Sequence, residues 1–369
     1  MFSGVENCNR IELADNALDA VPYVGSRSST VACTPWWWAR KYAAAEPITP
    51  PPMITKLDAM ALRVYSAEEV HAALPWADLA DALEDAFIAG DADVPLRHAH
   101  ALPGDGSLLL MPAWSPDALG VKLVTVMPGA AARGAGSVQA SYLLLDRHSG
   151  VPIALIDGEA LTLRRTAAAS ALAAQHLARP DAERLLVVGS GRLAPWMAQA
   201  HVALQPALVH VDVWGRNADA AEDVVEALRE EGIDAEVALD LRAAAERADL
   251  ITCATTSREP LLRGAWLREG MHLDLVGGFR RDMREVDDAA ILRARVVVDT
   301  YAGALAEAGD LTQPIERGVI TREHVVAELA QVLRGEVRGR LSRQDITLFK
   351  SVGTALEDLA AARLVAAGV

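Results

Sequence analysis

Apolar runs of strand length alternate with helical periodicity through the middle of this chain. Strand-like runs occur at 185–188, 208–214, 249–253, 271–276 and 295–299, and the stretch 218–231 has a helical pattern. Several of these runs are apolar at nearly every position, which is typical of parallel strands buried on both faces. The pattern predicts an α/β fold.

The part of the chain before residue 180 has a different pattern of apolar and polar residues. Ser66 and Glu69 form a predicted capping box, opening a helix that Pro75 ends, and a second helix follows over 77–89. Short strands broken by glycine and proline turns are predicted next, and then a helix rich in alanine; their ranges are 107–111, 120–126, 140–146, 152–157 and 162–177. We expect a mixed α/β unit here.

The two ends of the chain complete the predicted domain organisation. Residues 1–60 show no sustained period, so we expect a poorly ordered extension, with Met53 and Met60 as alternative starts. After about residue 303 the pattern becomes helical, notably at 323–333 and 353–367, and these helices are expected to pack back onto the first unit. The predicted domains are therefore 61–180 together with 304–369, and 181–303.

A glycine turn lies between the first strand of the central unit and its helix. Gly189 permits the tight turn, Gly191 allows the backbone to approach a phosphate, and Ala194 takes the place of the third glycine. Backbone N–H groups and the positive end of a helix then surround a pyrophosphate. We interpret 181–303 as a Rossmann dinucleotide-binding domain.

The end of the second strand predicts which dinucleotide binds. Arg216 and Asn217 occur where an NAD-preferring chain usually has an acidic residue, and Asp212 lies inside the strand, pointing away from the ligand. An arginine there suits a 2′-phosphate, so we predict NADPH, with NADH as the alternative. The predicted cofactor site also includes Thr166, Thr255, Val276 and Gly277.

Three cations occur where apolar residues are expected. Lys122 shares a strand face with Val124 and Val126, and of the adjacent Arg164 and Arg165 one can face inward from the helix while the other is solvated. A buried cation needs a fixed anionic partner, although a lysine can also extend to the rim of a core. Together with Arg97, these side chains suit a small carboxylate held by paired hydrogen bonds.

The composition of the chain argues against some classes of binding partner. The net charge of −15 argues against nucleic acid, and no apolar stretch reaches the length of a membrane span. Cys8, Cys33 and Cys253 lack the spacing of a metal site, so we expect no metal and a reducing, cytoplasmic location.

Several blocks in register resemble the ornithine cyclodeaminase/μ-crystallin family. They are Met111-Pro112, Lys122 with its flanking residues, Asp157-Gly158 with Arg165-Thr166, the Gly189 turn, and Phe349-Lys350-Ser351. The resemblance covers the chain from about Leu62 onward. It implies a Rossmann domain beside a mixed α/β domain built from both ends of the chain, which also forms a homodimer contact. It further implies that Lys122, Arg165 and Arg97 hold the substrate carboxylate.

Two departures from the cyclodeaminase pattern point to one branch of the family. Phe279 follows Gly277-Gly278 where those enzymes have an aspartate, and Leu109 replaces a glutamate. Without carboxylates for a second amine, the chain looks like a ketimine reductase that converts Δ1-pyrroline-2-carboxylate to L-proline with NADPH, and Δ1-piperideine-2-carboxylate to L-pipecolate. Asp310 or His100 is the candidate proton source. Ornithine cyclodeamination, alanine dehydrogenation and non-enzymatic NADPH-dependent ligand binding stay as alternatives.

Overall fold

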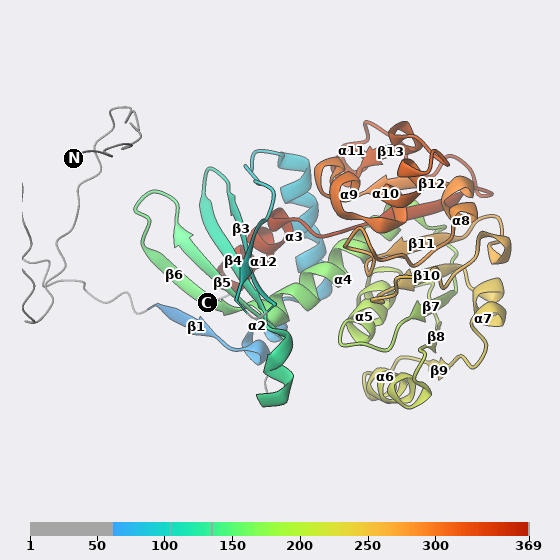
Figure 1. Ribbon diagram of the computed structural model, residues 1–369, viewed down its shortest axis with the longest axis horizontal. Helices are drawn as coiled ribbons and strands as arrows, with labels where there is room; N and C mark the ends of the chain where they lie inside the picture. The colour runs from blue at the N-terminus through green and yellow to red at the C-terminus, as the bar shows by residue number, and fades with distance from the viewer. Residues whose placement is uncertain (1–61, 104, 134–135, 368–369) are drawn as a thin grey trace, which may run out of the picture. The chain divides into compact units, whose positions relative to one another are not determined.

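The computed structural model describes residues 62–367, apart from 104, 134 and 135. The predicted extension over 1–60, with its alternative starts at Met53 and Met60, lies outside the described residues. The described part contains two β-sheets, one of six strands and one of eight, each flanked by helices (Figure 1).

The six-stranded sheet has the order β1-β6-β5-β4-β3-β2 and is antiparallel except where β1 pairs with β6. The four strands predicted for this region are present, and the two edge strands β1 and β2 are additional. The bounds are β1 (Arg63–Tyr65), β2 (His98–Leu102), β3 (Gly106–Trp114), β4 (Ala118–Val126), β5 (Val138–Asp146) and β6 (Pro152–Asp157).

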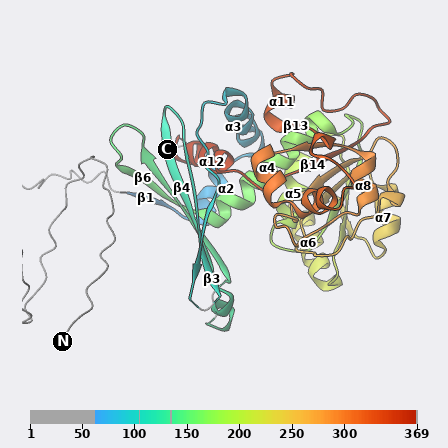
Figure 2. The same cartoon turned by 45° about the horizontal axis from the view of Figure 1, so that its top comes forward.

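Helices pack on one face of this sheet, as Figure 2 shows from a second angle. They are α2 (Ala67–Ala73), α3 (Trp76–Ala89), α4 (Gly158–Leu177) and α12 (Ala355–Ala367). Met111, Tyr142 and Ile156 of the sheet are buried with Leu161 of α4 and Leu359 of α12. The Ser66–Glu69 capping box is present at the start of α2, as predicted.

The eight-stranded sheet is parallel throughout and has the order β13-β12-β14-β11-β10-β7-β8-β9. The predicted α/β class and Rossmann-type sheet are confirmed. The strands are β7 (Arg184–Val188), β8 (His210–Trp214), β9 (Ala235–Val237), β10 (Leu250–Cys253), β11 (His272–Leu275), β12 (Ala294–Val298), β13 (Val325–Glu328) and β14 (Ile346–Lys350). The helices are α5 (Ala194–Leu204), α6 (Ala218–Glu230), α7 (Leu241–Arg247), α8 (Asp288–Arg293), α9 (Tyr301–Glu307), α10 (Gly309–Glu316) and α11 (Leu329–Leu333).

The part after residue 303 differs from the prediction. β13 and β14 join the eight-stranded sheet, with β14 between β12 and β11, so a boundary of that sheet at 303 is wrong. The helix expected over 323–333 is a single turn, a strand and the short helix α11. Periodicity alone does not separate a short apolar strand from a buried helical segment. Of the helices after 303, α12 packs on the six-stranded sheet as expected.

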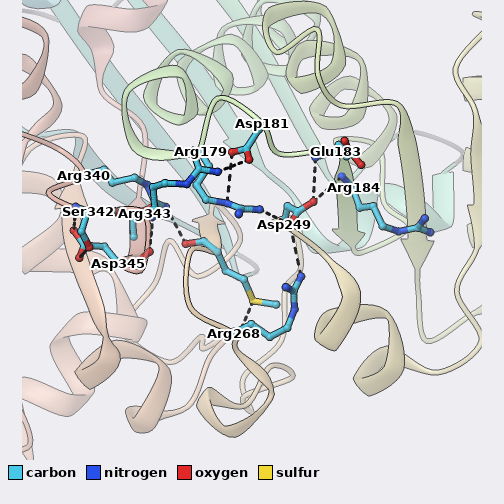
Figure 3. Close-up of polar contacts among 12 residues, drawn as sticks. Arg179, Asp181, Glu183, Arg184, Asp249, Arg268, Arg340, Ser342, Arg343 and Asp345 are labelled. Carbon is cyan, nitrogen blue, oxygen red and sulfur yellow. Dashed lines mark hydrogen bonds and ion pairs between the residues drawn. The ribbon is translucent and has the colours of Figure 1, made fainter.

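Polar contacts tie together the amino ends of the central parallel strands (Figure 3). Asp249 accepts hydrogen bonds from Arg179 Nη2 at 2.8 Å and from the backbone N–H groups of Glu183 and Arg184 at 3.0 and 3.2 Å. Arg340 donates to the carbonyl of Met271 at 3.1 Å. The amino edge is therefore closed by structural contacts, and the loops at the carboxyl edge are available for a ligand.

Candidate active site

A groove lies over the carboxyl ends of β7, β8 and β10. Its walls come from three loops, which supply Gly189, Ser190, Gly191, Trp214, Gly215, Arg216, Asn217, Ala254, Thr255, Thr256, Ser257 and Leu261. Five of the predicted cofactor residues line it: Gly189, Gly191, Arg216, Asn217 and Thr255. This is the switch point of the sheet, where the strand order reverses from β10 to β8 on either side of β7.

The glycine turn fits a pyrophosphate. Gly189 has φ +127°, and a Cβ there would meet the Ala254 carbonyl oxygen at 2.7 Å, so only glycine is accommodated. A Cβ at Gly191 would meet nothing within 4 Å, so the backbone is open on that side. α5 begins at the buried Ala194 without a side-chain cap on its N–H groups. Uncapped N–H groups at a helix start suit phosphate oxygens.

Arg216 and Asn217 follow β8 and line the groove. Arg216 is exposed there, and Asn217 caps α6 by accepting from Asp219 N at 3.1 Å. Asp212 is buried and accepts from Arg247 Nη2 at 2.6 Å. Its carboxylate is engaged by Arg247 rather than offered to a ribose.

Glu285, which sequence reasoning missed, fixes the loops beyond β10 and β11. Its carboxylate accepts from Thr255 N at 2.8 Å and from the backbone N–H groups of Gly277 and Gly278 at 2.8 and 3.2 Å. Burial raises the pKa of Glu285 to about 7. A Cβ at Gly277 would lie 2.0 Å from the Thr255 carbonyl oxygen, so this close approach requires glycine.

Two further predicted cofactor residues lie beside this loop. Val276, directly after β11, is buried in a cluster with Ala167 and Ala171 of α4. Thr166, on the same helix, is also buried. Val276 and Thr166 therefore lie where α4 packs against the parallel sheet.

The two candidate proton sources lie in different surroundings. Asp310, on α10, is fully buried and accepts from the backbone N–H groups of Glu285 and Val286 at 2.8 and 3.1 Å. Its other oxygen lies 3.4 Å from Lys350 Nζ. His100 is exposed on the edge strand β2. Oδ1 of Asp310 thus holds the backbone at Glu285 and Val286, while a Cβ at Gly278 would meet Oδ2 at 2.3 Å. The role of Asp310 or His100 as the proton source stays a prediction.

Lys122 and Arg165 converge on one carboxylate. Lys122 Nζ lies 2.7 Å from Asp358 Oδ2, and Arg165 Nε donates to Asp358 Oδ1 at 3.0 Å. Arg165 Nη1 also donates to Glu357 Oε2 at 2.5 Å. All four side chains are at most 6% exposed. We call Lys122, Arg165, Glu357 and Asp358 the buried charge cluster.

Burial and pairing shift the pKa values in this cluster. Burial lowers the pKa of Lys122 to about 8, against the attraction of Asp358, and raises that of Glu357 to about 7, against the attraction of Arg165. Burial would also raise the pKa of Asp358, but Arg165 and Lys122 together hold it below its usual value. Of the two carboxylates in the cluster, Asp358 is therefore the one whose ionised form is favoured.

Arg97 approaches the same region from the segment before β2. Its Nη2 lies 3.1 Å from Glu307 Oε2 and donates to the carbonyls of Val352 and Gly353 at 3.0 and 3.2 Å. Gly353 has φ +81°, and a Cβ there would meet Arg165 Nη1 at 2.7 Å. A pocket is lined by Arg97, Met111, Thr300, Gly303, Gly353 and Thr354, among others. Arg97 and Arg165 thus lie at the segment that leads into α12, and Lys122 contacts α12 itself through Asp358.

The acidic partners of these cations were not predicted. Glu357 and Asp358 are adjacent in a segment, 355–367, that is otherwise mostly alanine and leucine. Two carboxylates in an apolar helix are as unexpected as a lysine on an apolar strand face. A buried charge needs a partner of opposite charge, so this pattern could have identified Glu357 and Asp358 as candidate partners of the buried cations.

One group of side chains has metal-ligand geometry within the described residues. His210, Asp212 and Glu236 offer atoms within 4.8 Å of one another, at β8 and β9. Arg184 and Arg247 already pair with Asp212. Because these cations occupy the carboxylate, the group fits an ion-pair network better than a metal.

The sequence profile of the ornithine cyclodeaminase/mu-crystallin family matches residues 60–368. The chain belongs to this family. The resemblance noted in the sequence is therefore confirmed. Leu109 lies on the face of β3 that also carries Met111, the pairing partner of Lys122, and Phe279 is 39% exposed beside Gly278.

Similar proteins with named activities cover most of the chain. Δ(1)-pyrroline-2-carboxylate reductase of Paracoccus denitrificans is 39% identical over 296 residues, which are 79% of this chain and 92% of that protein. The structure of the Thermococcus litoralis enzyme of that name, in complex with NADH and L-proline, is 35% identical with a TM-score of 0.79, covering 83% of this chain and 97% of that one. An archaeal alanine dehydrogenase dimer with bound NAD is 29% identical with a TM-score of 0.78, covering 83% and 95%.

Proposed function

We propose that this protein is an NADPH-dependent imine reductase that converts Δ1-pyrroline-2-carboxylate to L-proline, and also Δ1-piperideine-2-carboxylate to L-pipecolate. The observation that carries the proposal is the convergence of Lys122 and Arg165 on Asp358, in the same unit as a groove suited to a dinucleotide. The names of the Paracoccus and Thermococcus relatives support a nicotinamide-dependent enzyme acting on a carbon–nitrogen double bond.

The protein's part in this reaction is mainly positioning. Lys122, Arg165 and Arg97 would hold the carboxylate of the cyclic imine and so orient its C2 for hydride transfer. Gly189, Gly191 and Arg216 would hold the dinucleotide, which would supply the hydride for C2, and Asp310 or His100 would supply the proton for the imine nitrogen. The buried surroundings of Lys122 and Arg165 exclude water, which strengthens their attraction for the carboxylate.

The residues near the site favour a ring with one charged group. Leu109 shares the sheet face of Lys122, and Phe279 follows the Gly277–Gly278 turn. Neither side chain can accept a hydrogen bond from a second ammonium group, and an unsatisfied buried ammonium is costly. Ornithine is therefore a poor substrate in this proposal.

A set of parallel assays tests the proposal. NADPH oxidation is followed with pyrroline-2-carboxylate, with piperideine-2-carboxylate, and with pyruvate plus ammonia, while ammonia release is followed with ornithine. We expect the highest kcat/KM with the cyclic imines. A higher value with pyruvate plus ammonia would favour the alanine dehydrogenase alternative, which the similarity to the archaeal enzyme motivates. Ornithine turnover would favour the cyclodeaminase, and binding without any turnover would favour the non-enzymatic alternative.

The preference for NADPH rests on Arg216. The exposed guanidinium at the groove suits a 2′-phosphate, so Arg216→Asp should lower kcat/KM for NADPH by about 10- to 150-fold, as expected for a lost hydrogen bond to a charged group of about 1.5–3 kcal/mol. The value for NADH should change little. Steady-state kinetics with both cofactors measures the ratio, and an unchanged ratio would make NADH, seen in the Thermococcus complex, the better assignment.

We also propose a homodimer formed through the six-stranded sheet. The face opposite α4 and α12 carries Leu110, Val121, Leu123, Leu143 and Leu155, which are only partly buried. A continuous apolar face of this kind is typical of a protein interface. Light scattering on the purified protein should give twice the chain mass of 39.3 kDa, and a monomer at micromolar concentration would contradict the proposal.

Among the described residues, no helix has the length and apolar character needed to cross a bilayer. Cytoplasmic localisation and the absence of a nucleic-acid partner stay predictions from composition.

A further inference from the structure

The formal charges of the buried charge cluster cancel. Lys122 and Arg165 carry two positive charges, and Glu357 and Asp358 two negative ones, on side chains that are between 0% and 6% exposed. A ligand carboxylate bound to this cluster adds one negative charge. An uncompensated charge in such surroundings is costly, so a compensating change must accompany binding.

The two carboxylates of the cluster are held differently. Asp358 accepts from both Lys122 and Arg165, whereas Glu357 accepts from Arg165 Nη1 alone among the described residues. The second oxygen of Glu357, Oε1, is buried and has no hydrogen-bond partner within the described part of the chain. Glu357 is thus the carboxylate whose charge is least compensated.

The charged groups around Glu357 come from three elements. Arg165 faces it from α4, Asp358 adjoins it on α12, and the buried Asp299 faces it from the end of β12. Lys122, on β4, reaches the cluster through Asp358. Asp358 and Asp299 are negatively charged. Their repulsion disfavours the ionised form of Glu357, and so does its burial.

We propose that binding of a carboxylate ligand at Arg165 is coupled to the uptake of one proton by Glu357. The inference rests on the proposed function, because it takes the ligand to be a carboxylate held by the cluster. The ion pair between Arg165 and Glu357 breaks, Arg165 pairs with the ligand carboxylate, and Glu357 receives a proton from the solvent. The net charge of the cluster, ligand included, stays at zero.

The coupling sets the pH dependence of binding. The pKa of Glu357 before binding is about 7, and the added negative charge of the ligand raises it further. Below pH 7 Glu357 is already protonated, so the affinity is nearly constant. Above pH 7 each bound ligand must bring a proton, so Kd rises by up to about tenfold per pH unit.

Titration calorimetry with the full chain and NADPH tests the proposal. The probe is pyrrole-2-carboxylate, a planar five-membered ring whose carboxylate stays ionised and whose nitrogen does not titrate near neutral pH. Binding heats at pH 8 are compared in phosphate, HEPES and Tris, whose ionisation enthalpies differ. The wild type should take up between about half a proton and one proton per site, and Kd should rise between pH 7 and pH 8.

The variant Glu357→Gln separates this role from a structural one. Glutamine carries no charge, so the variant cluster is positive before binding and neutral afterwards. We expect tighter binding of pyrrole-2-carboxylate than in the wild type at pH 8 and a smaller rise of Kd between pH 7 and pH 8. Proton uptake should fall below the wild-type value by the share of Glu357, and the remainder, at most about half a proton, belongs to Lys122, whose pKa is about 8. Asp274→Asn, which removes a buried carboxylate from β11 in the other sheet, is the control and should keep the wild-type uptake.

The outcomes are distinguishable. Wild-type binding without proton uptake overturns the inference and leaves the proposed function standing. Uptake in Glu357→Gln that is as large as in the wild type assigns the proton to another group, such as Lys122, and also overturns the inference. If pyrrole-2-carboxylate does not bind and no cyclic imine is reduced, the proposed function itself fails. If the variant does not fold, the wild-type measurement still tests whether binding takes up a proton.

Discussion

Replacing Lys122 with methionine is expected to lower kcat/KM for pyrroline-2-carboxylate by about 30- to 1,000-fold, equivalent to about 2–4 kcal/mol. Methionine keeps the length of the side chain and its packing on β4, but it removes one of the two cations that face Asp358. Arg165 is then shared between Asp358, Glu357 and the substrate carboxylate, so the attraction for the substrate falls. Steady-state NADPH oxidation measures the loss.

Two measurements show that such a loss arises at the substrate carboxylate. NADPH affinity, followed by nucleotide fluorescence, should be unchanged, since the groove that begins at Gly189 does not include Lys122. Lys122→Arg keeps the charge and should retain more activity than the methionine variant. Full activity of Lys122→Met would place the substrate elsewhere.

Replacing Asp358 with asparagine is expected to lower the free energy of unfolding by about 3–5 kcal/mol at pH 7. The substitution preserves volume but leaves Lys122 and Arg165 buried with only Glu357 as an anion. Urea denaturation followed by circular dichroism measures the change. Asp117→Asn is the matched control, since Asp117 is exposed and lies 4.0 Å from Arg363, and it should shift stability by less than about 0.5 kcal/mol.

The pH dependence of this difference has a definite sign. The pKa of Asp358 is lower in the folded protein than in the unfolded chain, because Arg165 and Lys122 outweigh the effect of burial. Its stabilising contribution is therefore present above the unfolded pKa and is lost as the pH falls through the folded one. The gap between wild type and Asp358→Asn should narrow toward acid pH. A gap that is constant or widens would show that the asparagine acts through packing instead of charge.

Local patterns determined most of the nucleotide-binding half. A glycine turn between an apolar strand and a helix is a property of neighbouring residues, so Gly189, Gly191 and Arg216 could be predicted to line one groove, as they do. The capping box at Ser66 and the strands around Lys122 are local for the same reason. The family blocks, also short and in order, added the fold and the expected carboxylate clamp.

For the part of the chain after residue 303, strand pairing in the tertiary structure decided which segments are strands. β13 and β14 have four and five residues and pair with apolar strands of the parallel sheet. The periodicity of runs this short does not separate a strand from a buried helix.

By itself, the sequence determined that Lys122 and Arg165 required buried anionic partners, since an unpaired buried cation is too costly. Only the tertiary structure decided that the protein supplies these partners, Glu357 and Asp358, because Lys122 and Asp358 are 236 residues apart in the chain. The physical reason is that periodicity describes one element at a time, whereas a charge cluster is assembled from side chains on a strand and two helices.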